Sequence, residues 1–142
     1  MLPFFAYGTL RPGQRNHAQY LGGRCEAVRP AVLDGAALHR GPGYPYAVLA
    51  PGQRVHGDLI TVRPADYPAV LAALDDLEDC LPDGSGIYVR LSLPVTVQPR
   101  AVRPGADARQ VDAWVYLAGP AESARLRAAP APIPSGDWLR RG

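Results

Sequence analysis

The chain has 142 residues, of which 47% are hydrophobic and 20% are charged, a composition that argues against an intrinsically disordered protein. Its net charge of +2 comes from scattered arginines, because the sequence contains no lysine, and no basic stripe predicts nucleic-acid binding. With 15 glycines and 16 prolines, we expect a single turn-rich domain over residues 1–142.

The chain begins with a short apolar strand that ends abruptly. The segment from Pro3 to Tyr7 predicts this strand, and Gly8 terminates it. A loop then continues through Gln14 and leads into a helical turn at residues 16–21. A strand followed by Gly-Thr can turn several backbone N–H groups toward one point and bind an anion, but most such segments are only turns. Both interpretations of the loop stay open at this level.

The middle of the chain predicts two β-hairpins. The first pairs residues 26–33 with 36–39 around Asp34-Gly35, and the second pairs residues 46–50 with 55–62 around Pro51-Gly52-Gln53. The segment GPGYP, residues 41–45, forms the turn between the two hairpins.

The second half of the chain predicts one clear helix and two strands. The helix begins at Pro64 and ends before the segment LPDGSG, the Leu81-Gly86 loop. Strands follow at 87–97 and 111–117, separated by a loop from Pro99 to Ala108. A Pro/Ala-rich tail from about residue 119 either wraps the surface with Trp138 as an anchor or is partly disordered. The fold class is therefore α+β, a mixed sheet or small barrel with one principal helix.

No part of the chain indicates a membrane span, a metal site or a redox motif. No stretch approaches the roughly 20 apolar residues of a transmembrane helix, and the N-terminus lacks the features of a signal peptide. Cys25 and Cys80 form no CxxC motif and have too few close ligands for a zinc site. We expect a cytoplasmic protein with two free thiols, without cofactor, metal, nucleic-acid or membrane partner; its oligomeric state is not predicted.

One glutamate stands out in the acidic segment LDDLEDC, residues 74–80. The apolar residues of the predicted helix are Tyr67, Val70, Leu71, Leu74 and Leu77. At about 100° per residue, Glu78 falls about 20° from Tyr67, inside the apolar arc, whereas the neighbouring aspartates lie at its margin or on the polar face. A carboxylate aimed inward would lose solvation, its pKa would rise, and it would become a better base. Alternatively, the helix unwinds before Glu78, and the side chain caps a loop or faces water.

Several segments together resemble the gamma-glutamylcyclotransferase-like family, which includes the gamma-glutamylamine cyclotransferases and AIG2-like proteins. The resemblance rests on segments in family order over most of the chain: FAYGTLRPGQRNH (5–17), GYP (43–45), HGDLITV (56–62), LDDLEDC (74–80) and YVR (88–90). The ending SGDW (135–138) is similar to bacterial relatives. The opening YGTL, rather than YGSN, favours the gamma-glutamylamine branch, and the Leu81-Gly86 loop departs from many relatives, which leaves leaving-group specificity open.

The resemblance implies a small mixed β-barrel with flanking helices and an enzyme that releases 5-oxoproline and a free amine from a small gamma-glutamyl amide. It implies that Glu78 is the catalytic acid/base and that the substrate-binding residues are Tyr7, Gly8, Thr9, Leu10, Tyr88, Arg90 and Tyr116. No metal or cofactor is required. The alternatives are a non-catalytic module that binds a small metabolite in the same pocket and, less favoured, a protein-interaction domain.

Overall fold

A computed structural model describes residues 1–98 and 109–141, so the predicted Pro99–Ala108 loop lies outside the described residues. Its elements in chain order are β1 (Phe4–Ala6), α1 (His17–Leu21), β2 (Cys25–Arg40), β3 (Pro45–Val62), α2 (Tyr67–Leu77), β4 (Tyr88–Val97), β5 (Arg109–Ala118), α3 (Pro120–Ala128) and the 3-10 helix η1 (Trp138–Arg140). The α+β class predicted from the sequence is confirmed.

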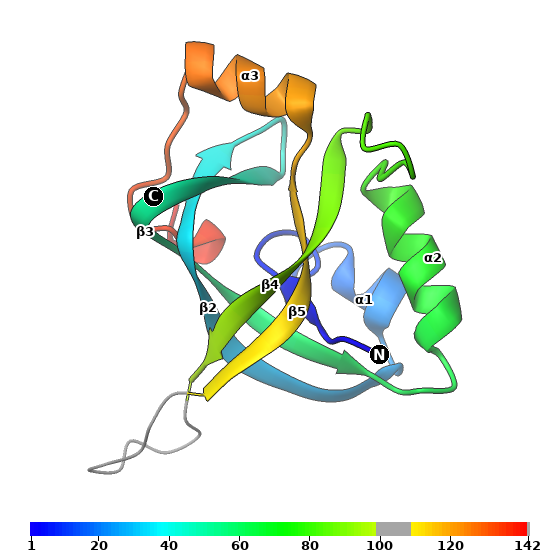
Figure 1. Cartoon of the computed structure of the whole chain (residues 1–142). Helices are drawn as coiled ribbons and strands as arrows, with labels where there is room; N and C mark the ends of the chain where they lie inside the picture. Colours follow the sequence, from blue (N-terminus) through cyan, green and yellow to red (C-terminus); the bar gives the residue numbers. More distant parts are fainter. Residues whose placement is uncertain (99–108, 142) are drawn as a thin grey trace, which may run out of the picture.

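The five strands form a small barrel in the order β1-β3-β2-β4-β5 (Figure 1). Neighbouring strands are antiparallel except at the closure, where β1 and β5 run parallel and pair through Phe4 and Trp114. Helices α1 and α2 lie beside each other on one side of this barrel, and α3 lies at one end. The predicted mixed barrel with flanking helices is therefore confirmed.

The two hairpins predicted in the middle of the chain are wrong, because β2 and β3 are single long strands. Asp34 pairs with Arg54 and Ala36 pairs with Leu49, so the ladder continues past both expected turns with an irregularity in register. Gly35 and Gly52 have positive φ, at 80° and 82°. An irregularity within a strand can use a glycine of positive φ just as a hairpin turn does, which is why the same residue signal misled the prediction. The chain reverses only at residues 41–44, inside the predicted GPGYP turn.

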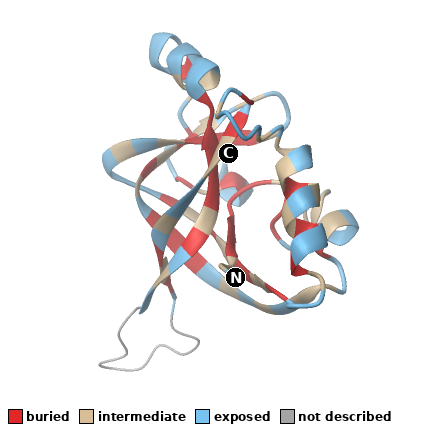
Figure 2. Ribbon diagram, turned by 45° about the vertical axis from the view of Figure 1, so that its right-hand side comes forward, coloured by how far each residue is buried: buried red, intermediate tan, exposed pale blue. Residues whose placement is uncertain are grey.

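Helix α2 packs its apolar face against the barrel. Tyr67, Val70 and Leu74 are buried, while the opposite face of α2 is exposed (Figure 2). The helix begins at Tyr67 rather than at Pro64, because residues 64–66 form a turn that is closed by the Tyr67 N–H and the Pro64 carbonyl at 3.3 Å. Pro68 occupies the first turn, where a missing N–H costs nothing.

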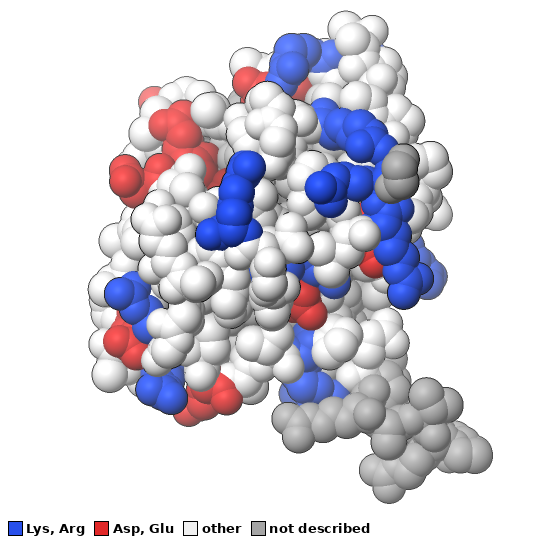
Figure 3. All heavy atoms as spheres, turned by 180° about the vertical axis from the view of Figure 1, so that it is seen from behind, with Lys and Arg blue, Asp and Glu red and all other residues white. Residues whose placement is uncertain are grey.

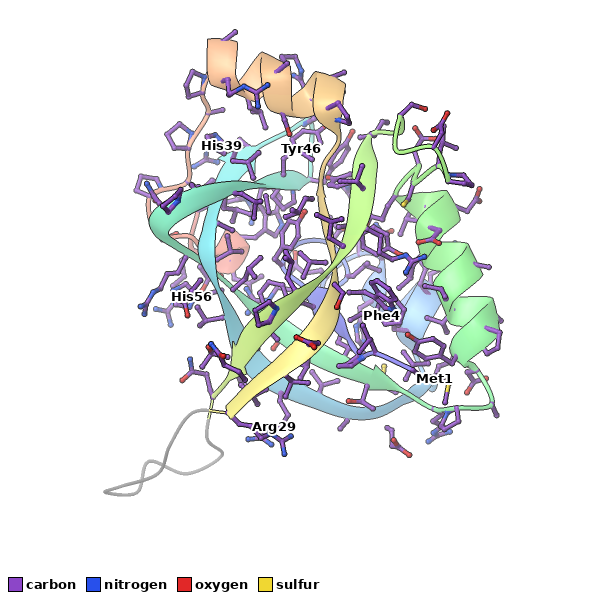
Figure 4. The ribbon with its side chains drawn as sticks, viewed as in Figure 1. Met1, Phe4, Arg29, His39, Tyr46 and His56 are labelled. Carbon is purple, nitrogen blue, oxygen red and sulfur yellow. The ribbon has the colours of Figure 1, made fainter. Side chains whose placement is uncertain are left out.

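The buried side chains form two clusters, one inside the barrel and one between the barrel and the helices. Phe4 belongs to the outer cluster, on the side of the barrel that faces α2 (Figure 4), with its ring 5.7 Å from that of Tyr67. Trp138 belongs to the inner cluster and is 6% exposed, as the anchored interpretation of the tail predicts. The tail also contains α3, which the sequence did not predict.

Both cysteines are free thiols, as expected. Within the described residues, no helix has the length and apolarity needed to cross a membrane.

Candidate active site

A cavity of about 230 Å³ lies where the opening loop meets the end of α2 and the strands β4 and β5. It brings together seven of the eight residues that the sequence analysis proposed for the site. These are Tyr7, Gly8, Thr9, Leu10, Glu78, Tyr88 and Tyr116. The opening loop and the end of α2, which are about half of the chain apart in sequence, therefore line the same small cavity.

The opening loop lines this cavity with residues 7–10. The Arg11 N–H closes a turn onto the Gly8 carbonyl at 3.1 Å, and Asn16 fixes Thr9 through a side-chain contact of 2.9 Å and a backbone contact of 3.0 Å. Among the described residues, none accepts a hydrogen bond from the N–H groups of residues 8, 9 and 10. Since the loop lines the cavity, these donors are available to an anionic or carbonyl oxygen.

Gly8 is placed against the side chain of Pro45. A Cβ at position 8 would lie 2.8 Å from both Cδ and Cγ of Pro45, which is too close for a side chain. The carbonyl of Pro45 is in turn fixed by the Tyr88 hydroxyl, which donates to it at 2.7 Å. The close approach of these two segments explains why glycine follows the first strand.

Glu78 lies at the junction between helix α2 and the following loop. The helix ends at Leu77, yet the Glu78 N–H still donates to the Leu74 carbonyl at 2.9 Å, so Glu78 continues the helical direction. Asp79 then adopts a left-handed conformation with φ of 50°, which turns the chain away. Helical spacing therefore placed Glu78 on the inward face, although the helix itself stops one residue earlier.

The carboxyl of Glu78 is half-buried and largely removed from water. Burial raises its pKa from 4.5 to about 7. Among the described residues, no side chain or backbone group forms an ion pair or hydrogen bond with this carboxyl. A carboxylate with a pKa near neutrality can accept a proton and return it at the same pH.

Three tyrosines form much of the remaining lining. The Tyr7 hydroxyl donates to the Tyr116 carbonyl, and the Tyr116 hydroxyl donates to Asp75 at 2.7 Å. Burial raises the pKa of Tyr7, Tyr88 and Tyr116, and the nearby Glu78 raises each of them further. The tyrosines are therefore neutral hydrogen-bonding groups at physiological pH.

Arg90, the eighth proposed residue, is not among the residues that line the cavity. Its guanidinium contacts Asp75 through two nitrogens at 2.9 and 3.3 Å and lies 4.2 Å from the centre of the Trp114 ring. Asp75, which helical spacing placed outside the inward face, is therefore bound to both Arg90 and Tyr116. The Asp75–Arg90 ion pair connects α2 to β4.

The sequence analysis missed eight residues that line the cavity: Phe5, Ala6, Arg15, Asn16, Tyr44, Pro45, Leu77 and Ile87. All of them except Ile87 lie in segments that carried the family resemblance, so the motifs pointed to these segments without separating lining residues from their neighbours. Among the described residues, no three His, Cys, Asp or Glu side chains come close enough together to bind a metal ion.

The surface charge is uneven around the end of α2. Asp76, Asp79 and Asp83 are exposed there, and acidic side chains gather in this region of the face shown in Figure 3. Basic side chains occupy several separate positions on the same face. The acidic neighbours of Glu78 thus point into solvent, whereas Glu78 itself lines the cavity.

A family model described as "Gamma-glutamyl cyclotransferase, AIG2-like" matches residues 4–140. The crystal structure of a mouse AIG2-like protein is 30% identical in sequence, with a TM-score of 0.59 over 82% of this chain and 76% of the mouse chain. An Arabidopsis thaliana protein known from a solution structure is 26% identical, with a TM-score of 0.57 over 82% of this chain and 61% of its own.

More distant structures share the fold alone. A yeast gamma-glutamyl cyclotransferase specific to glutathione is 14% identical, with a TM-score of 0.60 over 99% of this chain and 82% of the yeast chain. No curated protein sequence gives a significant match.

Proposed function

The chain belongs to the AIG2-like gamma-glutamyl cyclotransferase family, and we propose that it converts small gamma-glutamyl amides into 5-oxoproline and a free amine. The observation that supports this proposal best is the position of Glu78. Among the described residues, the half-buried Glu78 carboxyl has no partner, and it shares one cavity with opening-loop N–H groups from which none of these residues accepts a hydrogen bond. A proton acceptor and a set of oxygen-binding donors are the two requirements of this reaction.

The reaction is an intramolecular acyl transfer. The glutamyl α-nitrogen attacks the side-chain carbonyl carbon of the same residue, and a new C–N bond closes a five-membered lactam. The bond from that carbon to the leaving nitrogen then breaks. Starting from an ammonium, the α-nitrogen loses two protons before it is a lactam N–H, and the leaving nitrogen takes up two and departs as an ammonium, so water and a protein nucleophile are not consumed.

Glu78 moves the proton in this scheme. An ammonium group is not a nucleophile, so the α-nitrogen must lose a proton before it can attack. The ionised Glu78 carboxylate accepts that proton, and the resulting carboxylic acid returns it to the departing amine; the second proton, lost by the ring nitrogen after the attack, follows the same route. A pKa of about 7 suits both steps, because neither form of the carboxyl is then strongly favoured.

The opening loop binds and orients the glutamyl group. The N–H groups of Gly8, Thr9 and Leu10 donate to the α-carboxylate or to the oxygen that becomes negative during attack. Holding the glutamyl group at this loop orients its chain toward the bent conformation that ring closure needs. Tyr7, Tyr88 and Tyr116 enclose the reacting atoms, while Arg90 supports Tyr116 through Asp75.

Glu78→Gln tests the proposal, because glutamine keeps the shape of the side chain and cannot accept the proton. We expect release of 5-oxoproline from a panel of gamma-glutamyl amides to fall about 1000-fold or more, at the upper part of the range for general acid–base catalysis. Asp76→Asn, which alters an exposed acid on the same helix, is the matched control and should retain activity.

The pH dependence of kcat/KM provides a second measurement. Since Glu78 must be ionised to accept the proton, kcat/KM should rise with pH and level off above a pKa of about 7. Full activity in the Gln variant would exclude Glu78 as the base. Ligand binding without any product would instead favour a non-catalytic binding module.

A further inference from the structure

A second cavity, of about 460 Å³, lies between helix α3 and the end of the barrel. It has about twice the volume of the cavity that contains Glu78, and the two cavities have no lining residue in common. Its apolar walls come from β3, β4, β5 and α3, through Val48, Leu49, Val89, Leu117, Ala118 and Leu126. A cavity of this size and character is typical of sites that bind small molecules.

The cavity exists because α3 is fixed at both ends but packs through a single side chain. Of its residues only Leu126 is buried. Before the helix, the Gly119 N–H donates to the Ile87 carbonyl at 2.7 Å, and after it the Ala131 carbonyl accepts from the Arg40 N–H at 2.7 Å. The helix is thus held at the end of the barrel (Figure 1) without an apolar face that could close onto the strands.

The polar side chains that line this second cavity are suited to an anion. They are His39, Ser123 and Arg127, and none of the lining residues is acidic. Arg127 lies in the last turn of α3 and is exposed. Among the described residues, none forms an ion pair, a hydrogen bond or a ring contact with its guanidinium. The donors of Arg127 are therefore available to a ligand.

His39 provides a second donor beside the same cavity, at the end of the barrel near α3 (Figure 4). Its Nδ1 accepts from the Ala131 N–H at 3.2 Å, so this nitrogen carries no proton. Burial lowers the pKa of His39, which keeps the ring neutral at physiological pH with its proton on Nε2. Among the described residues, none accepts a hydrogen bond from Nε2.

We propose that this cavity is a second binding site, which takes a small carboxylate with an apolar body. The body packs against the apolar walls, and the carboxylate binds the Arg127 guanidinium, which can donate two parallel hydrogen bonds, with His39 as a further donor. A cation is disfavoured because the lining contains a base and no acid. The inference does not depend on the proposed cyclotransferase activity, since the two cavities have separate linings.

Isothermal titration calorimetry with octanoate, octanamide and hexanoate tests the chemistry of the site. Octanamide has the same chain as octanoate without the charge and should bind about tenfold more weakly, as expected for one exposed charge-assisted contact. Hexanoate should bind about 15-fold more weakly than octanoate, because each buried methylene contributes about fourfold. Absence of octanoate binding at millimolar concentration, or equal binding of octanoate and octanamide, would overturn the proposal.

Two variants at exposed positions test the assigned residues. Arg127→Gln should lower the affinity for octanoate to that for octanamide and leave octanamide unchanged. Leu49→Asp, at a lining residue that is 63% exposed, places an acid in the cavity and should weaken octanoate about tenfold or more. Arg63→Gln, at an exposed arginine that lines neither cavity, is the control and should change neither affinity. An unchanged octanoate affinity in Arg127→Gln would contradict the role of Arg127.

Backbone amide NMR spectra locate the bound octanoate. Its addition should shift the amide signals of residues 117–118 and 123–127 and leave those of residues 7–10 in place. Shifts confined to residues 7–10 would put octanoate in the cavity of Glu78 and would overturn the second site.

Discussion

Two charged regions adjoin the opening loop and are built in opposite ways. In one, Arg11 donates to Asp58 and to Asp137 at 2.8 Å each, and the three side chains are between 10% and 15% exposed. In the other, Glu78 faces the cavity without a partner among the described residues, and burial raises its pKa to about 7. The opening loop therefore adjoins both a cluster of paired charges, Arg11 with Asp58 and Asp137, and the carboxyl of Glu78, which has no partner among the described residues.

The difference distinguishes a structural role from a chemical one. The Arg11 cluster connects the opening loop to β3 and to the segment before η1, where Asp137 also accepts from the Leu139 N–H at 3.0 Å. Every charge there has a partner, so the cluster fixes the loop at little electrostatic cost. A buried carboxyl without a partner costs stability, and such groups are found where a protein uses the shifted pKa.

Removing the compensating cation should produce the largest loss of stability. Arg11→Met leaves Asp58 and Asp137 partly buried without their shared partner, and we expect about 3 kcal/mol of destabilisation at pH 7. Urea unfolding would measure the change. Arg54→Gln is the control, since Arg54 and Asp34 are 3.6 Å apart and both more than half exposed, and should cost under about 1 kcal/mol. Similar losses in both variants would remove the distinction between the cluster and an ordinary surface pair.

Removing the charge of Glu78 should increase the unfolding free energy, whereas removing the charge of Arg11 should decrease it. The pKa of Glu78 is higher in the folded chain, so its contribution to the unfolding free energy falls as pH rises from about 4.5 to about 7 and is constant above. Glu78→Gln should therefore be more stable than the natural protein at pH 8, by about 3 kcal/mol. The difference should disappear at pH 4. The exposed Glu26→Gln is the control, and a destabilised Gln variant at pH 8 would show that Glu78 has a stabilising partner.

The sequence predicted those parts of the fold that depend on local patterns. The first strand, the GPGYP turn, the apolar face of α2 and the last two strands all follow from spacing and breakers within short windows. The bend at Gly35 and Gly52 could not be separated from a pair of hairpins, because both arrangements need positive φ and differ only in long-range pairing. Helix α3 was missed because it buries Leu126 alone and therefore has no apolar stripe.

The residues of the candidate site were likewise predictable only where they follow a local pattern or a family motif. Helical spacing was sufficient to direct Glu78 inward, and the family motifs pointed to the loop that shares its cavity. The partners of Asp75 were not predictable, because they come from β4 and β5 and depend on how the barrel closes against α2. Arg15 lies inside the motif FAYGTLRPGQRNH, but nothing in the sequence separated it from its neighbours as a residue that lines the cavity.

Asp75 allows the comparison between a paired and an unpaired carboxylate to be tested on one helix. It lies one turn before Glu78 and accepts hydrogen bonds from Arg90 and Tyr116. Asp75→Asn removes the charge that Arg90 and Tyr116 bind, and we expect a loss of about 1–2 kcal/mol in unfolding free energy. Activity should fall modestly because Tyr116 shifts. The limb of the pH profile near 7 should stay in place, because burial sets the pKa of Glu78. A large displacement of that limb would show that Asp75 tunes the base electrostatically.

The smallest effect is expected from the contact that positions the loop. Gly8→Ala forces a Cβ to within 2.8 Å of the Pro45 ring, and we expect about 1 kcal/mol of destabilisation as the ring shifts. Because both residues line the cavity, KM for a gamma-glutamyl substrate should rise. Gly13→Ala is the matched control in the same loop: its φ of 83° makes alanine costly by a similar amount, but its Cβ would meet no atom within 4 Å. If both variants lose stability and only Gly8→Ala raises KM, the loop binds substrate at residue 8; an unchanged KM in both would place the glutamyl group elsewhere in the cavity.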